Sequence, residues 1–190
     1  MLGALIIVFR EVIEAGLIIG IVLAAARGIP GHRSWVALGV GGGIAGSAVV
    51  AMFAGTISDA FAGAGQEIFN AGVLGAAVVM LTWHNVWMAR HSREIVMNMH
   101  DVGAAVSAGT RPLTALGIVV GLAVLREGAE VVLFLYGVAV SGTSATAVLS
   151  GGFLGILAGA AFSALTYFGD RKSTRLNSSH IQKSRMPSSA

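Results

Sequence analysis

The motif Arg-Glu-x-x-Glu occurs twice in this 190-residue chain, at residues 10–14 and 126–130, each time near the middle of an apolar stretch. A charged side chain at the centre of a helix in lipid costs about 2.5 to 3.5 kcal/mol on insertion scales. Three charges together therefore oppose insertion by roughly 8 to 10 kcal/mol unless they face protein, water or a ligand. Two such groups of charges in matching places predict a functional site.

The chain as a whole has the composition of a membrane protein. It is 55% hydrophobic and 11% charged, with 27 glycines, which is too apolar for a soluble domain of this size. Its apolar stretches each meet the requirement of about 20 residues for a spanning helix. We predict an all-α fold, a polytopic transmembrane helix bundle that fills a domain of residues 1–170. The predicted spans cover residues 2–26, 35–57, 68–88, 113–140 and 145–168.

The last twenty residues differ from this pattern. The net charge of +3 suggests an acidic partner such as nucleic acid, but five of the twelve Lys and Arg residues lie after Asp170. Without residues 171–190, seven basic residues stand against nine acidic ones, so no nucleic-acid partner is expected. We interpret this polar, Ser-rich tail without periodicity as extraneous to the domain.

Basic residues also predict the orientation. Arg27 and Arg33 follow the first span, and Arg90, Arg93 and Arg111 lie between the third and fourth spans. The positive-inside rule puts these segments in the cytoplasm and the N-terminus outside. The first and fourth spans are then antiparallel, so that the two motifs lie at similar depth.

Small residues indicate an internal repeat. Gly42 and Gly46 lie four residues apart in the second span, as do Gly151, Gly155 and Gly159 in the fifth. Such spacing allows close packing of helices in lipid. Together with the repeated motif it predicts inverted-topology three-helix repeats, which place a binding site near the membrane midplane between the halves.

Helix geometry explains why the motifs suit a cation. Glu11 and Glu14 share one helix face, and so do Glu127 and Glu130, so that two carboxylates from each helix can converge. Their oxygens are hard ligands that suit ferric iron, Mn²⁺, Mg²⁺ or Ca²⁺. We predict these four glutamates as metal ligands. The absence of cysteine argues against soft-metal chemistry and iron–sulfur clusters.

The arginines are predicted to pair with the carboxylates. Arg10 precedes Glu14 by four residues, and Arg126 precedes Glu130 by the same spacing. Four glutamates against two arginines leave a charge of about −2, which favours a multivalent cation that competes with the arginines. A buried ion pair that holds the helices in register is the structural alternative. A proton relay through the same glutamates would use the same residues.

Other polar residues are accessory candidates. His84 lies within the third span, where a lone histidine is more often an interhelical hydrogen bond than a ligand. His91 and Glu94 could receive an ion that leaves the pore, although a solvated connector explains them more simply. Glu67 lies where the outer end of the third span is expected.

The motifs in their apolar setting resemble the oxidase-dependent iron transporters, which comprise the fungal high-affinity ferric permeases and the bacterial EfeU-type permease. Residues 125–135 and the Gln-Glu-Ile-Phe segment at 66–69 are also similar to this family. The resemblance implies high-affinity iron uptake across the inner (plasma) membrane, with iron as the transported substrate and no permanently bound cofactor. It implies that the motif glutamates are the iron ligands. Its implied partners, besides the lipid bilayer, are a ferroxidase or periplasmic cupredoxin-like and haem-peroxidase proteins.

The chain departs from that family in two ways. The family usually has seven helices, so the resemblance implies five helices of seven and a chain truncated at its C-terminus. Asn70 lies where many relatives have an acidic residue.

Two further classes of function stand against the permease. A non-transporting membrane subunit could use the motifs to assemble with a partner, and a transporter could carry another multivalent cation or protons. An enzyme is not expected, because the sequence has no Cys nucleophile, no His-rich metal cluster and no cofactor fingerprint.

Overall fold

The computed structural model describes residues 1–60 and 65–184, and the side chains of residues 1–56, 65–91, 93–167 and 169. The regular elements in these residues are all α-helices, as the sequence predicted. They are α1 (Leu2–Ala25), α2 (His32–Ala60), α3 (Gln66–Ser107), α4 (Thr114–Val140) and α5 (Ala145–Ser184).

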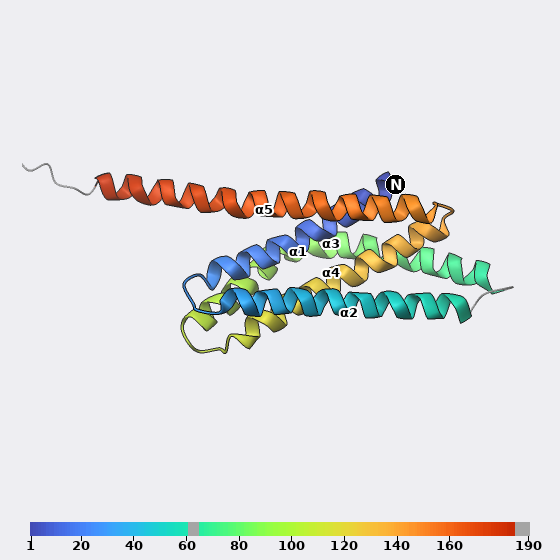
Figure 1. The fold of residues 1–190 in the computed structure, drawn as a ribbon, viewed down its shortest axis with the longest axis horizontal. Coiled ribbons are helices and arrows are strands. Elements are labelled where there is room, and N and C mark those ends of the chain that lie inside the picture. Colours follow the sequence, from blue (N-terminus) through green and yellow to red (C-terminus); the bar gives the residue numbers. More distant parts are fainter. Residues whose placement is uncertain (61–64, 185–190) are drawn as a thin grey trace, which may run out of the picture.

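Helices that follow one another in the sequence run in opposite directions along a common axis (Figure 1). In this view α5 and α2 form opposite edges, and α1 and α4 lie between them. The closest pairs are α1 with α5 and α2 with α4, while α3 packs on both α1 and α4. The α1–α2 and α3–α4 turns lie at one end of the bundle, which is also the end that carries Arg27, Arg33 and Arg111.

Glycines end three of the helices. Gly28, Gly109 and Gly142 have φ angles of 97°, 72° and 92° just beyond α1, α3 and α4. This left-handed conformation costs glycine little, because it has no Cβ, and it commonly ends a helix. The turns can therefore be short, which keeps the helices antiparallel.

Two helices are longer than their apolar stretches. We predicted a span at 68–88, but α3 continues to Ser107, so that Arg90 and Arg93 lie on the helix and not in a loop. The segment after residue 88 is polar but rich in good helix formers, which explains the continuation. The fifth helix was predicted to end at residue 168 and instead continues to Ser184, through most of the segment where we saw no periodicity.

Three helical segments in the described residues are long and apolar enough to cross a membrane. They are His32–Thr56, Gln66–His91 and Ala145–Tyr167. The other two helices, α1 and α4, have 24 and 27 residues, but each carries the three charges of a motif. Their length meets the requirement of about 20 residues for a span, and their place in the bilayer remains a prediction.

Close contacts relate α1 and α2 to α4 and α5 in the way that the predicted inverted repeat implies. A Cβ added at Gly43 of α2 would lie 2.7 Å from Cβ of Val124 in α4. A Cβ added at Gly155 of α5 would lie 2.8 Å from Cβ of Val8 in α1. Val124 lies two residues before the Arg126 motif and Val8 two residues before the Arg10 motif. The α2–α4 contact is therefore repeated between α5 and α1.

The same correspondence continues along both interfaces. A Cβ added at Gly39 would meet the backbone of Gly117, and a Cβ added at Gly151 would meet the backbone of Met1. The predicted Gly151, Gly155 and Gly159 all face α1, but the prediction for α2 was wrong in part. Gly46 faces Leu125, whereas a Cβ at Gly42 would find nothing within 4 Å, so Gly42 lies outside the interface.

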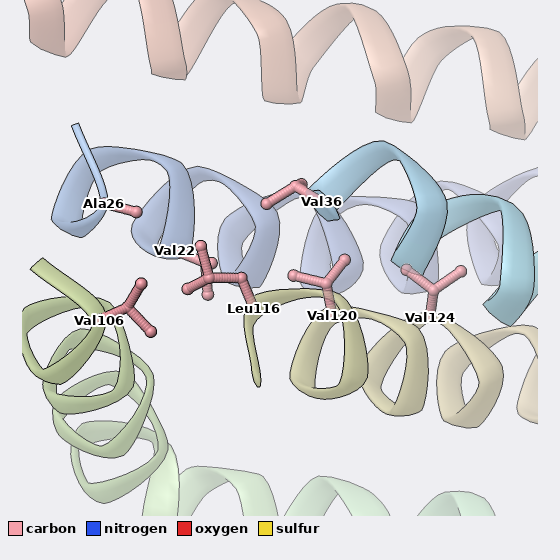
Figure 2. Packing of buried hydrophobic residues seen from close by; sticks show 7 residues of the cluster. All are labelled: Val22, Ala26, Val36, Val106, Leu116, Val120 and Val124. Carbon is pink, nitrogen blue, oxygen red and sulfur yellow. The ribbon is translucent and has the colours of Figure 1, made fainter. Parts of the chain in front are cut away.

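An apolar core closes the bundle on one side of the motifs. It joins α1, α2, α3 and α4 near the end that carries the arginines (Figure 2). Leu116 and Val120 are fully buried at its centre. This core fixes the two motif helices against each other. Its buried members are Val22, Ala26, Val36, Val106, Leu116, Val120 and Val124.

Candidate metal centre

The first glutamates of the two motifs meet at the interface of α1 and α4. The side chains of Glu11 and Glu127 are only 1% and 4% exposed. Each contributes one oxygen to a group of ligand atoms that lie within 4.8 Å of one another. Two carboxylates this close repel each other when both are ionised, so a proton or a cation between them stabilises the pair.

Each arginine pairs with the second glutamate of its own motif. Nε of Arg10 donates to Oε1 of Glu14 at 2.9 Å, and Nε of Arg126 donates to Oε1 of Glu130 at 3.2 Å. Arg10 also lies 3.8 Å from Glu11 through Nη1. The spacing that predicted these pairs is therefore realised as two matching ion pairs on antiparallel helices.

His84 of α3 lies between the two motifs. Its ring is 3% exposed, with Nε2 3.1 Å from Oε2 of Glu14 and Nδ1 3.0 Å from Oε2 of Glu130. Nη2 of Arg126 is 2.8 Å from the same Nδ1 atom. A guanidinium can only donate, so Nδ1 accepts this bond and the ring proton lies on Nε2, which donates to Glu14. His84 therefore connects both motifs through two different nitrogens.

Four buried residues bring one ligand atom each to within 4.8 Å of one another: Glu11, His84, Glu127 and Glu130. The carboxyl oxygens include several that are buried without a hydrogen-bond partner: Oε1 and Oε2 of Glu11, Oε2 of Glu127 and Oε2 of Glu130. A buried acceptor without a partner costs about 1 to 3 kcal/mol, and more when it is charged. A cation at this place would satisfy one such oxygen from each of the three glutamates.

Glu14 lies outside this group of four. Oε1 of Glu14 accepts from Arg10 and Oε2 from His84. We predicted Glu14 as a ligand and His84 as an accessory residue, and both roles stay predictions.

The accessory candidates lie elsewhere. His91 is half-buried and stacks on Trp87 with ring centroids 5.0 Å apart, and its Nδ1 donates to the Trp87 carbonyl at 3.0 Å. Glu67 and Glu94 are exposed and do not join the cluster. The side chain of Asp59, an acidic residue that precedes Glu67 in the segment predicted to lie outside, is not among those described.

Trp87 was not among the predicted site residues. The guanidinium carbon of Arg126 lies 5.3 Å from the centre of its ring. Its position one turn after His84 on the same face of α3 is the signal that could have found it. Trp83, by contrast, is largely exposed.

A cavity of about 760 Å³ lies against the cluster and is lined by α1, α2, α4 and α5. Glu11 and Glu127 contribute to its wall, together with Ser47 and Ser163. The Ser163 hydroxyl is buried without a hydrogen-bond partner. The two central carboxyl groups are thus reached from this side, while His84 approaches from α3.

The profile of the family described as "Iron permease FTR1 family" matches residues 1–180 of the chain. The match extends into the tail that we interpreted as extraneous.

Curated relatives share about a third of their aligned residues with the chain. The ferrous iron permease EfeU of Escherichia coli O6:K15:H31 is 31% identical over 134 residues, which are 68% of this chain and 48% of the relative. The EfeU of Escherichia coli K12, described as an inactive ferrous iron permease, is 33% identical over 141 residues with the same coverage. The ferrous iron permease EfeU of Shigella flexneri serotype 5b is 35% identical over 105 residues, 55% of this chain and 44% of the relative. The chain spans about half the length of the relatives it matches. No solved structure matches it.

Proposed function

Because the chain belongs to the iron permease FTR1 family, we propose that it carries iron ions across a membrane through the cluster formed by its two Arg-Glu-x-x-Glu motifs. The family is one of transporters, the class that the sequence predicted in place of an enzyme. The observation that carries the proposal is the set of buried, unpartnered carboxyl oxygens at the contact of Glu11, Glu127 and Glu130.

The charges at the cluster favour a multivalent cation. Four glutamates and two arginines leave a charge of about −2 when the His84 ring is neutral. The arginines neutralise the second glutamates, so the central pair of Glu11 and Glu127 remains for the ion. Iron that enters would take the place of a proton or another cation between them.

Ferrous iron is the substrate that we propose, because the matched relatives are named ferrous iron permeases. High affinity is supported by the burial of the carboxylates, since attraction between charges is stronger in a low dielectric. We propose as partners a ferroxidase, or periplasmic cupredoxin-like and haem-peroxidase proteins, on the basis of the family resemblance alone.

The proposed location is the inner membrane, with the N-terminus outside. Support comes from Arg27, Arg33 and Arg111, which gather at one end of the bundle. The positive-inside rule makes this end cytoplasmic. The outer end is then the one where α3 begins.

Proton movement through the same glutamates is the second candidate. It is favoured by the contact of Glu11 with Glu127, which a shared proton would satisfy as well as a metal. The two candidates differ in what crosses the membrane.

The test is uptake of radioactive ferrous iron by a bacterial strain without its own high-affinity importers. The strain would express the full chain, Glu11→Gln, Glu127→Gln, or the matched control Asp101→Asn, which removes an exposed carboxylate outside the cluster. We expect both cluster variants to lose uptake at normal membrane abundance, and the control to keep it. A fall in abundance in the cluster variants would instead indicate an assembly subunit. Proton flux without iron uptake would favour the second candidate.

A further inference from the structure

The two nitrogens of His84 are not equivalent. Nε2 carries the ring proton and donates to Glu14 at 3.1 Å, because Nδ1 must accept from Arg126 at 2.8 Å. The lone pair of Nδ1 also faces Oε2 of Glu130, 3.0 Å away, so two acceptor atoms lie side by side. An acceptor pair at this distance is satisfied by a cation that both can coordinate.

Glu14 has the position of a group that orients a metal ligand. Histidines that bind metals usually donate their other ring N–H to a carboxylate, which fixes the ring and makes the ligating nitrogen more basic. Glu14 accepts this bond and is itself held by Arg10. Both of its oxygens are engaged, and it lies outside the group of four that converges.

Arg126 occupies the place that an ion would take. Its Nη2 donates to Nδ1 of His84 and its Nε to Oε1 of Glu130, so that one guanidinium contacts both groups. Its side chain is 41% exposed, compared with 27% for Arg10. The Trp87 ring beside it offers a contact that can persist when the guanidinium leaves Nδ1.

We propose that His84 is the selectivity ligand of the site, with Nδ1 completing a set of three carboxylates from Glu11, Glu127 and Glu130. The inference rests on the proposed function. An imidazole suits iron and other transition metals, whereas Mg²⁺ and Ca²⁺ prefer oxygen ligands throughout. His84 therefore favours divalent transition-metal ions over the more abundant alkaline-earth ions. Glu14 is the residue that positions its ring.

The direct test is pulsed electron paramagnetic resonance of Mn²⁺ bound to the full chain in lipid nanodiscs. Coordination by His84 gives a coupling between the manganese electron spin and an imidazole ¹⁴N nucleus. We expect this coupling in the unchanged protein and in His91→Gln, the matched control. It should disappear in His84→Gln, whose amide can still donate to Glu14 and so keeps α3 in contact with α1.

The outcomes separate this inference from the function. Bound Mn²⁺ that depends on Glu127 but shows no ¹⁴N coupling would overturn the role of His84 and leave the permease intact. If no Mn²⁺ binds and Glu127→Gln leaves iron uptake unchanged, both proposals fail. If no Mn²⁺ binds while uptake depends on Glu127, only the role of His84 is rejected.

Selectivity supplies a second readout. Ferrous uptake would be measured in the presence of excess Mg²⁺ or Ca²⁺, at matched membrane abundance. We expect His84→Asp, which replaces nitrogen by oxygen, to lose discrimination by about tenfold or more, in the range reported for altered metal surroundings. Glu14→Ala should weaken the ¹⁴N coupling, and Glu14→Gln, which still accepts from Nε2, should keep it. Unchanged discrimination in His84→Asp would reject the proposal.

Discussion

The two motifs have the same residue pattern but different surroundings. Glu11 and Glu127 occupy equivalent places in the cluster, whereas Glu14 and Glu130 have different partners. Glu14 is tied to Arg10 and His84, while Glu130 keeps an oxygen without a hydrogen-bond partner.

The difference comes from α3. This helix packs on both α1 and α4, and it contributes one ring with two unlike nitrogens. A pair of motifs related by an inverted repeat is thereby made asymmetric by a residue that belongs to one repeat. A repeated sequence motif is thus not sufficient to assign the same role to both copies.

The strongest test of this asymmetry compares Glu130→Gln with Glu14→Gln. We expect Glu130→Gln to abolish iron uptake, because it removes a ligand oxygen from the cluster. Glu14→Gln should reduce metal affinity by about 10- to 100-fold, as for other groups that orient a ligand. Iron uptake would be measured in cells that express each variant, and metal affinity by titration of the two purified proteins.

Equal losses in the two variants would contradict the asymmetry. They would instead support Glu14 as a metal ligand, as the sequence predicted. Membrane abundance of both proteins provides the control for folding.

A smaller effect tests the symmetric part of the fold. Gly43→Ala and Gly155→Ala should each destabilise the bundle by about 1 to 3 kcal/mol, the usual range for overpacking. The added methyl groups would meet Val124 and Val8 at equivalent points of the two interfaces. Gly42→Ala is the matched control, because nothing lies within 4 Å of its added Cβ.

Unfolding of the detergent-solubilised variants would be followed by circular dichroism. A large effect of Gly43→Ala without one of Gly155→Ala would show that the repeats differ in packing as well as in chemistry.

The smallest expected effect concerns Trp87. Replacement by leucine removes a cation–π contact with Arg126, worth about 0.5 to 1 kcal/mol at exposed sites. Arg126 would then be held less firmly, and we expect the apparent metal affinity to change by only about two- to fivefold. Trp83→Leu, on an exposed neighbour, serves as the control in the same titration. A change above tenfold would indicate that Trp87 contributes to the cluster more directly.

Several parts of this arrangement could be predicted from sequence because they depend on local spacing. The pairs of Arg10 with Glu14 and of Arg126 with Glu130 follow from one helical turn. In α5, Gly151, Gly155 and Gly159 recur every four residues, and all three predicted members face α1. In α2 glycines occur at 39, 41, 42, 43, 46 and 55, so more than one stripe is available and the sequence does not specify which one packs.

The place of His84 could not be predicted in the same way. It depends on the register of α3, a helix of 42 residues, against α1 and α4. A shift by one turn moves a side chain by about 5.4 Å, enough to remove it from the cluster. Hydropathy located the apolar spans of α3 and α5 but not the ends of these helices, which continue beyond the spans.

The paired interfaces have a consequence for how such sequences change during evolution. Gly128, inside the second motif, leaves room for the side chain of Ser47, while Val12, inside the first motif, fills the room left by Gly159. A larger residue at position 128 can therefore persist only if position 47 becomes smaller, and the reverse holds for positions 12 and 159. Homologous sequences should exchange these residues in pairs, across segments far apart in the chain, so that covariation between them would mark the two interfaces.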